Sequence, residues 1–142
     1  MNSNLAPGGW AEFQDYSILP AGDDETVKLD HPVVRWEHLL SEAAYKIERE
    51  PSPGPKLEQW VRDAGFVNIT NRKFKLPCNT WPKDPALKKI GAWFLAVNLE
   101  GLEAYSLRLL CDVLGWTEAE VHVLLASVRA QMKDRNWHGY WW

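Results

Sequence analysis

Apolar residues recur every three or four positions over much of this chain, which is the spacing of amphipathic helices. The pattern predicts a helix from about Pro32 to Arg49, with Asp30 as its cap and Pro32 in its first turn. The proline-rich run at 51–55 ends this helix. A shorter helix is predicted at 57–64.

Three further helices are predicted after a loop at 78–85. The last of them starts with a capping box formed by Thr117 and Glu120. The apolar positions of the three helices are Leu87, Ile90, Phe94 and Val97; Leu102, Tyr105, Leu109 and Val113; and Val121, Leu124, Leu125, Val128 and Met132.

Two other segments alternate as β-strands do. The first, 10–16, follows a Pro-Gly-Gly turn and places Trp10 and Phe13 on opposite faces. The second, 66–76, ends at a proline, and the tail at 137–142 resembles the start of a third strand. We therefore expect an α+β fold in a single domain over 1–142, with a small sheet of two or three strands covered by four or five helices.

Composition excludes several classes of protein. The chain has 142 residues, of which 46% are hydrophobic and 25% charged, so we expect a globular protein with a real core. A net charge of -3 argues against non-specific nucleic-acid binding, which needs a cationic surface. No apolar run approaches the ~20 residues of a membrane span, and the N-terminus lacks the features of a secretory signal. The expected location is cytoplasmic.

The cysteines and tryptophans carry further information. Cys78 and Cys111 have no Cys or His at metal-ligand spacing, so we expect two free thiols and no metal, a disulfide being the alternative. Nine tryptophans are far more than usual. Most are expected in the core or at an interface, and a minority to line a pocket for a flat apolar ligand.

Several motifs carry a family resemblance. They are Leu5–Tyr16 (LAPGGWAEFQDY), Gly65–Ile69, Asn79–Asp84, Asn98–Ser106, Gly115–Arg129 and His138–Tyr140. In this order they resemble class I S-adenosylmethionine methyltransferases, above all the fungal LaeA-like group. The resemblance covers nearly the whole chain and identifies it with the C-terminal half of the family's doubly wound fold. A truncated methyltransferase-like fold is therefore expected.

The chain departs from that family at the cofactor site. It contains no G-x-G, and Gly8-Gly9 belongs to a later turn, so we expect no S-adenosylmethionine site and no other cofactor. In the parent fold the segment at 10–16 pairs with a strand from the other half. Its open edge predicts a homodimer or a complex with another chain.

The resemblance also implies site residues. His138 and Asp15 match positions near the family's substrate and are the expected catalytic pair, because imidazole titrates near neutrality. The expected substrate contacts are Tyr16, Trp81, Trp93 and Asn98. The alternatives are a structural histidine at position 138 and a turn-initiating aspartate at position 15.

Two classes of function remain open. The first is a small cofactor-independent enzyme of secondary metabolism, a cyclase, isomerase or pericyclase acting on an apolar polyketide- or terpenoid-like substrate. The alternative is a non-catalytic partner subunit or a truncated remnant of a methyltransferase. A serine hydrolase is disfavoured, because Ser106 and Ser127 lie in helices without a glycine elbow.

Overall fold

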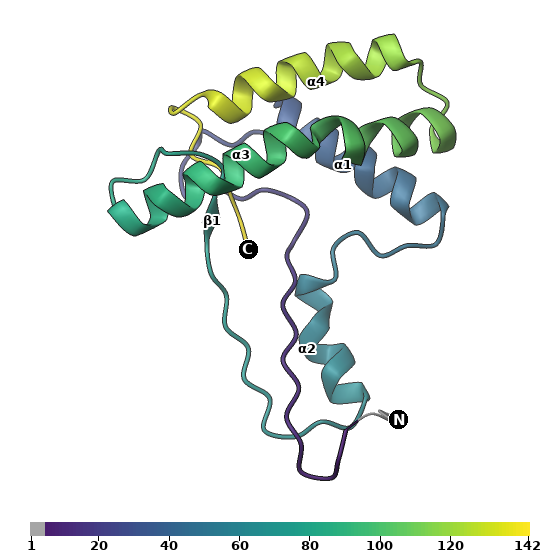
Figure 1. Ribbon diagram of the computed structural model, residues 1–142, viewed down its shortest axis with the longest axis vertical. Coiled ribbons are helices and arrows are strands. Elements are labelled where there is room, and N and C mark those ends of the chain that lie inside the picture. Colours follow the sequence, from purple (N-terminus) through teal and green to yellow (C-terminus); the bar gives the residue numbers. More distant parts are fainter. Residues whose placement is uncertain (1–4) are drawn as a thin grey trace.

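Three long helices form the body of the protein in the computed structural model, which describes residues 5–142. Helix α1 spans Pro32–Lys46, α3 spans Pro85–Leu107 and α4 spans Glu118–Lys133. A short π-helix, η1 (Arg108–Val113), continues α3 toward the turn before α4. Figure 1 shows these helices gathered in one layer, which contains the hydrophobic core.

The core is built from the inward faces of these helices and from the C-terminal segment. Among its members, Leu102, Leu125 and Val128 are completely buried. The indole N–H of Trp36 donates to the hydroxyl of Ser106 at 2.8 Å, so the polar atom of this buried tryptophan is satisfied. The other main core residues are Val33, Leu40, Leu110, Val121, Met132, Trp137 and Trp141.

The helix starts follow local sequence signals. The predicted capping box is confirmed, since Thr117 and Glu120 each accept a backbone N–H of the other. Pro32 is the first residue of α1, as expected. The cap of α1 is His31 rather than Asp30, and its side chain makes no capping hydrogen bond. A proline at the first position supplies no N–H, which lowers the need for a capping side chain.

The two helices predicted around residues 87–97 and 102–113 are one continuous helical run in α3 and η1. Gly101 does not interrupt it. A Cβ at this position would lie 2.5 Å from the ring of Tyr105, so the glycine makes room for that ring. The residue therefore serves packing inside a helix rather than chain reversal.

The sheet is small. Strand β1 (Leu76–Pro77) pairs antiparallel with β2 (Tyr140–Trp141), and Leu76 lies opposite Trp141. Ala21 forms an isolated bridge to Tyr140 on the other side, with N–H···O distances of 2.8 and 2.9 Å. The expectation of an α+β fold with a small sheet and four or five helices is confirmed.

The remaining elements extend away from the helical layer. Helix α2 (Gly54–Asp63) has no buried residue. Figure 1 shows it below α1, together with two long extended segments at 8–17 and 66–75. We call these two segments and α2 the extended region.

The strand predictions for 10–16 and 66–76 are wrong within the described part of the chain, apart from Leu76 and its place in β1. The two segments are extended, and the rings of Phe13 and Phe66 meet edge to face at 6.2 Å. No backbone ladder joins them among residues 5–142. Alternation favours an extended backbone, but a strand also needs a neighbour that supplies hydrogen bonds.

Candidate functional site: the outer face of the C-terminal segment

The C-terminal segment presents alternate side chains to two environments, as an extended chain does. Trp141 points into the core, where its indole N–H donates to the carbonyl of Ile18 at 2.8 Å. Tyr140 packs instead against Trp142, with ring centroids 5.1 Å apart and ring planes at 84°. His138, Tyr140 and Trp142 form the row of side chains on which the candidate site is built.

His138 pairs with an acid from the loop at 20–25. Its Nδ1 lies 2.6 Å from a carboxylate oxygen of Asp24. The same carboxylate accepts the hydroxyl and the backbone N–H of Thr26, at 2.6 and 3.0 Å. The bonds from Thr26, and then the bond from His138, lower the pKa of Asp24 to about 2. Asp24 is therefore an ionised acceptor for the imidazole at neutral pH.

Trp81 supports the imidazole from one side. The two ring centroids are 5.0 Å apart, and the indole N–H of Trp81 donates to the carbonyl of Gly139 at 3.0 Å. The backbone N–H of Trp81 donates in turn to the side chain of Asn79, which is buried and also bonds the carbonyl of Met132. This chain of contacts fixes Trp81 against the end of α4.

A second polar cluster adjoins this pair. The hydroxyl of Tyr140 donates to Asp23 at 2.7 Å, and the ammonium of Lys75 forms an ion pair with the same carboxylate. Lys75 Nζ also lies 4.3 Å from the ring centroid of Tyr140 and 5.5 Å from that of Trp142. The hydrogen bonds from Lys75 and Tyr140 lower the pKa of Asp23.

Only two of the six predicted site residues meet here, namely His138 and Trp81. Asp24 rather than Asp15 stands beside the imidazole. The Asp15 carboxylate accepts the backbone N–H of Tyr16 at 2.8 Å and lies exposed in the extended region. An aspartate that bonds the next N–H is typical of a loop.

The other predicted contacts lie elsewhere. Tyr16 packs near the start of α2, and desolvation, followed by the charge of Glu37, raises its pKa. Glu37 is itself buried in α1, and burial raises the pKa of its carboxyl. Trp93 is 68% exposed on α3, and the side-chain amide of Asn98 donates to the carbonyl of Phe94 at 2.8 Å. None of the hydrogen bonds, ion pairs or ring contacts found among residues 5–142 joins Tyr16, Trp93 or Asn98 to His138.

Sequence reasoning missed Asp24, Asp23, Lys75 and Thr26. The loop at 20–25 was visible as a polar, acidic stretch. Nothing local links that loop to the tail, because Asp24 and His138 lie 114 positions apart. The contact arises from the bridge between Ala21 and Tyr140, which brings the loop beside the tail.

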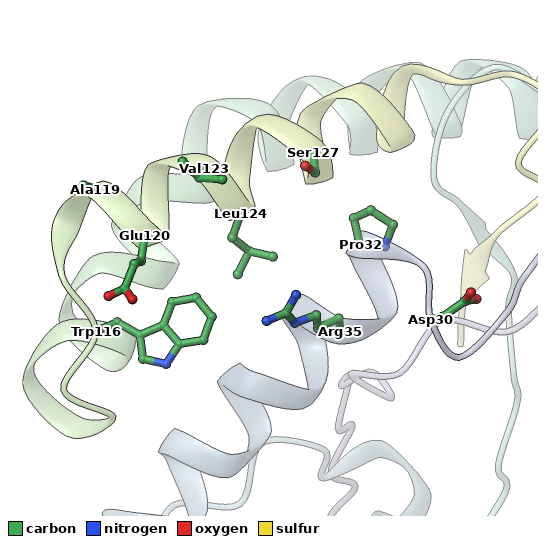
Figure 2. A pocket seen from close by; sticks show the side chains of 9 residues that line it. All are labelled: Asp30, Pro32, Arg35, Trp116, Ala119, Glu120, Val123, Leu124 and Ser127. Carbon is green, nitrogen blue, oxygen red and sulfur yellow. The ribbon is translucent and has the colours of Figure 1, made fainter.

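Two surface hollows flank the helical layer. One, of about 360 Å³, adjoins the candidate site through Thr26 and Trp137. The indole N–H of Trp137 is buried without a hydrogen-bond partner among the described residues. The larger groove, of about 570 Å³, lies between α1 and α4, where Arg35 stands 5.9 Å from the ring of Trp116. Figure 2 shows that none of the predicted site residues lines it.

The cysteines are unpaired. Cys78 is buried under the sheet and burial raises its pKa to about 12, whereas Cys111 is half-buried on η1. Among residues 5–142, no group of three His, Cys, Asp or Glu side chains is arranged to hold a metal ion. None of the helices in this part of the chain is long and apolar enough to cross a membrane.

Comparison with known proteins shows what the chain is similar to. It is 38% identical over 139 residues to the probable methyltransferase tdiE of Emericella nidulans. The aligned residues make up 98% of this chain and 44% of the relative. The methyltransferase pytC of Aspergillus terreus is 40% identical over 136 residues, or 96% of this chain and 42% of the relative. The secondary metabolism regulator LAE1 of Cochliobolus heterostrophus is 33% identical over 140 residues, or 97% and 46%.

No protein-family model matches the chain, and no solved structure matches it significantly. The chain spans less than half the length of the curated relatives it matches. Within that span the similarity is continuous over nearly all of its residues. Along nearly its whole length the chain is therefore similar to fungal methyltransferases and LaeA-like proteins, consistent with a C-terminal portion of such proteins.

Proposed function

We propose that this chain is a small methyltransferase-derived enzyme that moves a proton on an apolar small molecule, as a cyclase or isomerase does. One observation carries the proposal: the Asp24 carboxylate lies 2.6 Å from Nδ1 of His138, and Trp81 packs against the same imidazole. The relatives named as methyltransferases and regulators of secondary metabolism support a role in fungal secondary metabolism.

The proton inventory of the pair supports base catalysis. Asp24 is ionised and can only accept, so Nδ1 of His138 carries the proton that joins them. In the neutral form of this imidazole, Nε2 is then the acceptor. It would take a proton from a substrate C–H bond, whose electron pair moves into an enolate, and return that proton at another atom. Positioned general bases contribute about 10²- to 10⁴-fold in rate.

Such a reaction fits the residues that are present. Isomerisation and cyclisation consume no methyl donor, and the sequence holds no G-x-G with which to cradle one. Trp81 offers apolar surface beside the imidazole for a polyketide- or terpenoid-like skeleton.

The test follows proton exchange on a generic aromatic ketone. The protein is incubated with α-tetralone in D₂O, and loss of the α-proton signal is followed by NMR. The expected result is an accelerated exchange that falls at least tenfold in His138→Ala. His122→Ala is the matched control, because that histidine also lies near a carboxylate, 4.0 Å from Glu103, on the exposed side of α4. Equal rates in both variants would remove His138 from the chemistry.

A second function is favoured by the extended region. Its two segments have no ladder among residues 5–142, and Trp10, Val67 and Phe74 are 85%, 79% and 68% exposed. Exposed apolar side chains on an unpaired extended backbone are typical of a surface that pairs with another chain. In this alternative the chain is a non-catalytic subunit, or a remnant, that pairs with a copy of itself or with a cofactor-binding partner.

Light scattering and calorimetry separate the two functions. We expect a homodimer or a stable complex when the chain is co-expressed with the remaining portion of the tdiE relative. Calorimetry with S-adenosylmethionine would then show binding by the complex and none by the chain alone. A monomer that ignores the tdiE portion would exclude the subunit function, and binding by the chain alone would contradict a cofactor-free protein.

A further inference from the structure

The side chain of Lys75 ends inside a small cluster of aromatic and acidic groups. Its ammonium touches the carboxylate of Asp23 and lies over the faces of two rings, 4.3 Å from the centroid of Tyr140 and 5.5 Å from that of Trp142. The two rings meet at 84°, so they form two walls of a corner. The carboxylate of Asp23, bonded to the Tyr140 hydroxyl at 2.7 Å, adds a third side.

This arrangement has the chemistry of a cation site. An ammonium within about 6 Å of a ring centroid is attracted by the ring quadrupole, and perpendicular aromatic walls are how proteins enclose methylated ammonium groups. A carboxylate at the third side adds charge complementarity. We propose that Asp23, Tyr140 and Trp142 form a binding site for an organic ammonium group, and that Lys75 fills this site when no ligand is present.

The walls and the occupant are held very differently. Tyr140 is only 3% exposed and is fixed on both sides, by β1 and by the double hydrogen bond with Ala21. Lys75 ends the segment at 66–75, which has no ladder among residues 5–142, and its ammonium hangs on a flexible four-carbon stem. A ligand can therefore replace the lysine head without rebuilding the Tyr140 wall.

The position of the ammonium site extends the proposed function. Asp23 adjoins Asp24, and Tyr140 is two positions beyond His138, so the ammonium corner and the acid–base pair are neighbours on one face. An ammonium held in the corner would set the adjoining part of the same molecule near the imidazole. The substrate class is then an amine on an otherwise apolar skeleton. This assignment to a substrate rests on the proposed function, whereas the ammonium site itself does not.

The test uses tetramethylammonium chloride as the probe and the full chain as the protein. Binding is measured by calorimetry, with sodium chloride at equal ionic strength as the blank. Lys75→Met opens the corner, and we expect it to bind the probe at least tenfold more tightly than the wild type. Lys73→Met is the matched control on the same segment and should match the wild type.

A second substitution decides whether the aromatic walls are responsible. Adding Trp142→Ala to Lys75→Met should weaken probe binding at least tenfold, whereas adding Trp142→Phe should retain most of it. The proposal is overturned if opening the corner produces no gain, or if the gain survives loss of the Trp142 ring. Circular dichroism of each variant checks the fold.

The two proposals fail separately. Probe binding requires no turnover, so a His138→Ala variant without proton exchange would still take up tetramethylammonium once Lys75 is replaced. Conversely, an active wild type whose Lys75→Met variant ignores the probe would retain the acid–base function and lose the ammonium site.

Discussion

The helical layer and the extended region both carry regular hydrophobic patterns, of helical spacing in the layer and alternating at 10–16 and 66–76, yet only the layer buries its apolar side chains. In the layer, Leu125 and Val128 are completely buried, and each helix satisfies its own backbone through local bonds. In the extended region, Val67 is 79% exposed, and α2 buries nothing. A helix completes its hydrogen bonds within a few residues, whereas an extended segment depends on a neighbour. The helices of the layer therefore complete their backbone hydrogen bonds by themselves, whereas the segments at 8–17 and 66–75 need a neighbouring strand to do so.

Hydrogen exchange should separate the two regions most strongly. Residues 67–75 donate no backbone hydrogen bond to another described residue, so their amides should exchange near the rate of an unstructured chain. Amides in the middle of α4 should exchange at least about a thousandfold more slowly than those at 67–75, because they open only when the core unfolds. Mass spectrometry on peptides from both regions measures this. Strong protection at 67–75 in the isolated chain would mean that these segments pair with a second copy.

Truncating one apolar side chain in each region should cause very different losses of unfolding free energy. Leu125→Ala empties a fully buried position in α4 and should cost about 2–5 kcal/mol of unfolding free energy. Val67→Ala removes an exposed side chain and should stay within about 0.5 kcal/mol. Urea titrations of both variants give the two values. A comparable loss at Val67 would show that its side chain is covered in solution.

The buried polar contact in the core offers a smaller effect. Ser106→Ala leaves the indole N–H of Trp36 without its partner at 2.8 Å, and an unsatisfied buried donor costs about 1–3 kcal/mol. Ser127→Ala, on the exposed side of α4, is the control and should change little. The same urea titration applies. No difference between the two serines would indicate that another acceptor reaches Trp36.

The smallest expected effect is a loss of stability at low pH. The folded pKa of Asp24 is about 2, below the ordinary value of 3.8, so its bonds to Thr26 and His138 stabilise the fold fully above pH 4. That contribution is lost as pH falls from about 4 toward 2. Asp24→Asn should therefore lower the melting temperature slightly at pH 6 and not at pH 2. Melting curves of both proteins at pH 6 and pH 2 test this. An equal difference in melting temperature at the two pH values would exclude the Asp24 carboxylate as its source.

Local signals made the helices predictable. The capping box at Thr117 and the proline at position 32 depend only on neighbouring residues, and both were found as expected. The strands at 10–16 and 66–76 were not, because pairing is a property of two segments and alternation describes only one. At the site, the resemblance pointed to His138 and Trp81. The role of Asp24 could not be predicted from the sequence, because its contact with His138 depends on the bridge between Ala21 and Tyr140.

The accessibility of the buried Cys78 thiol depends on the pairing of β1 with β2. Cys78 donates its S–H toward the carbonyl of Trp137 at 3.6 Å, and its backbone N–H bonds Gly139 at 3.0 Å. With a pKa of about 12 it holds almost no thiolate at neutral pH, and no reagent can reach it while β1 and β2 are joined. The rate of alkylation at Cys78 would therefore report the fraction of molecules in which β1 has parted from the C-terminal segment, which carries His138.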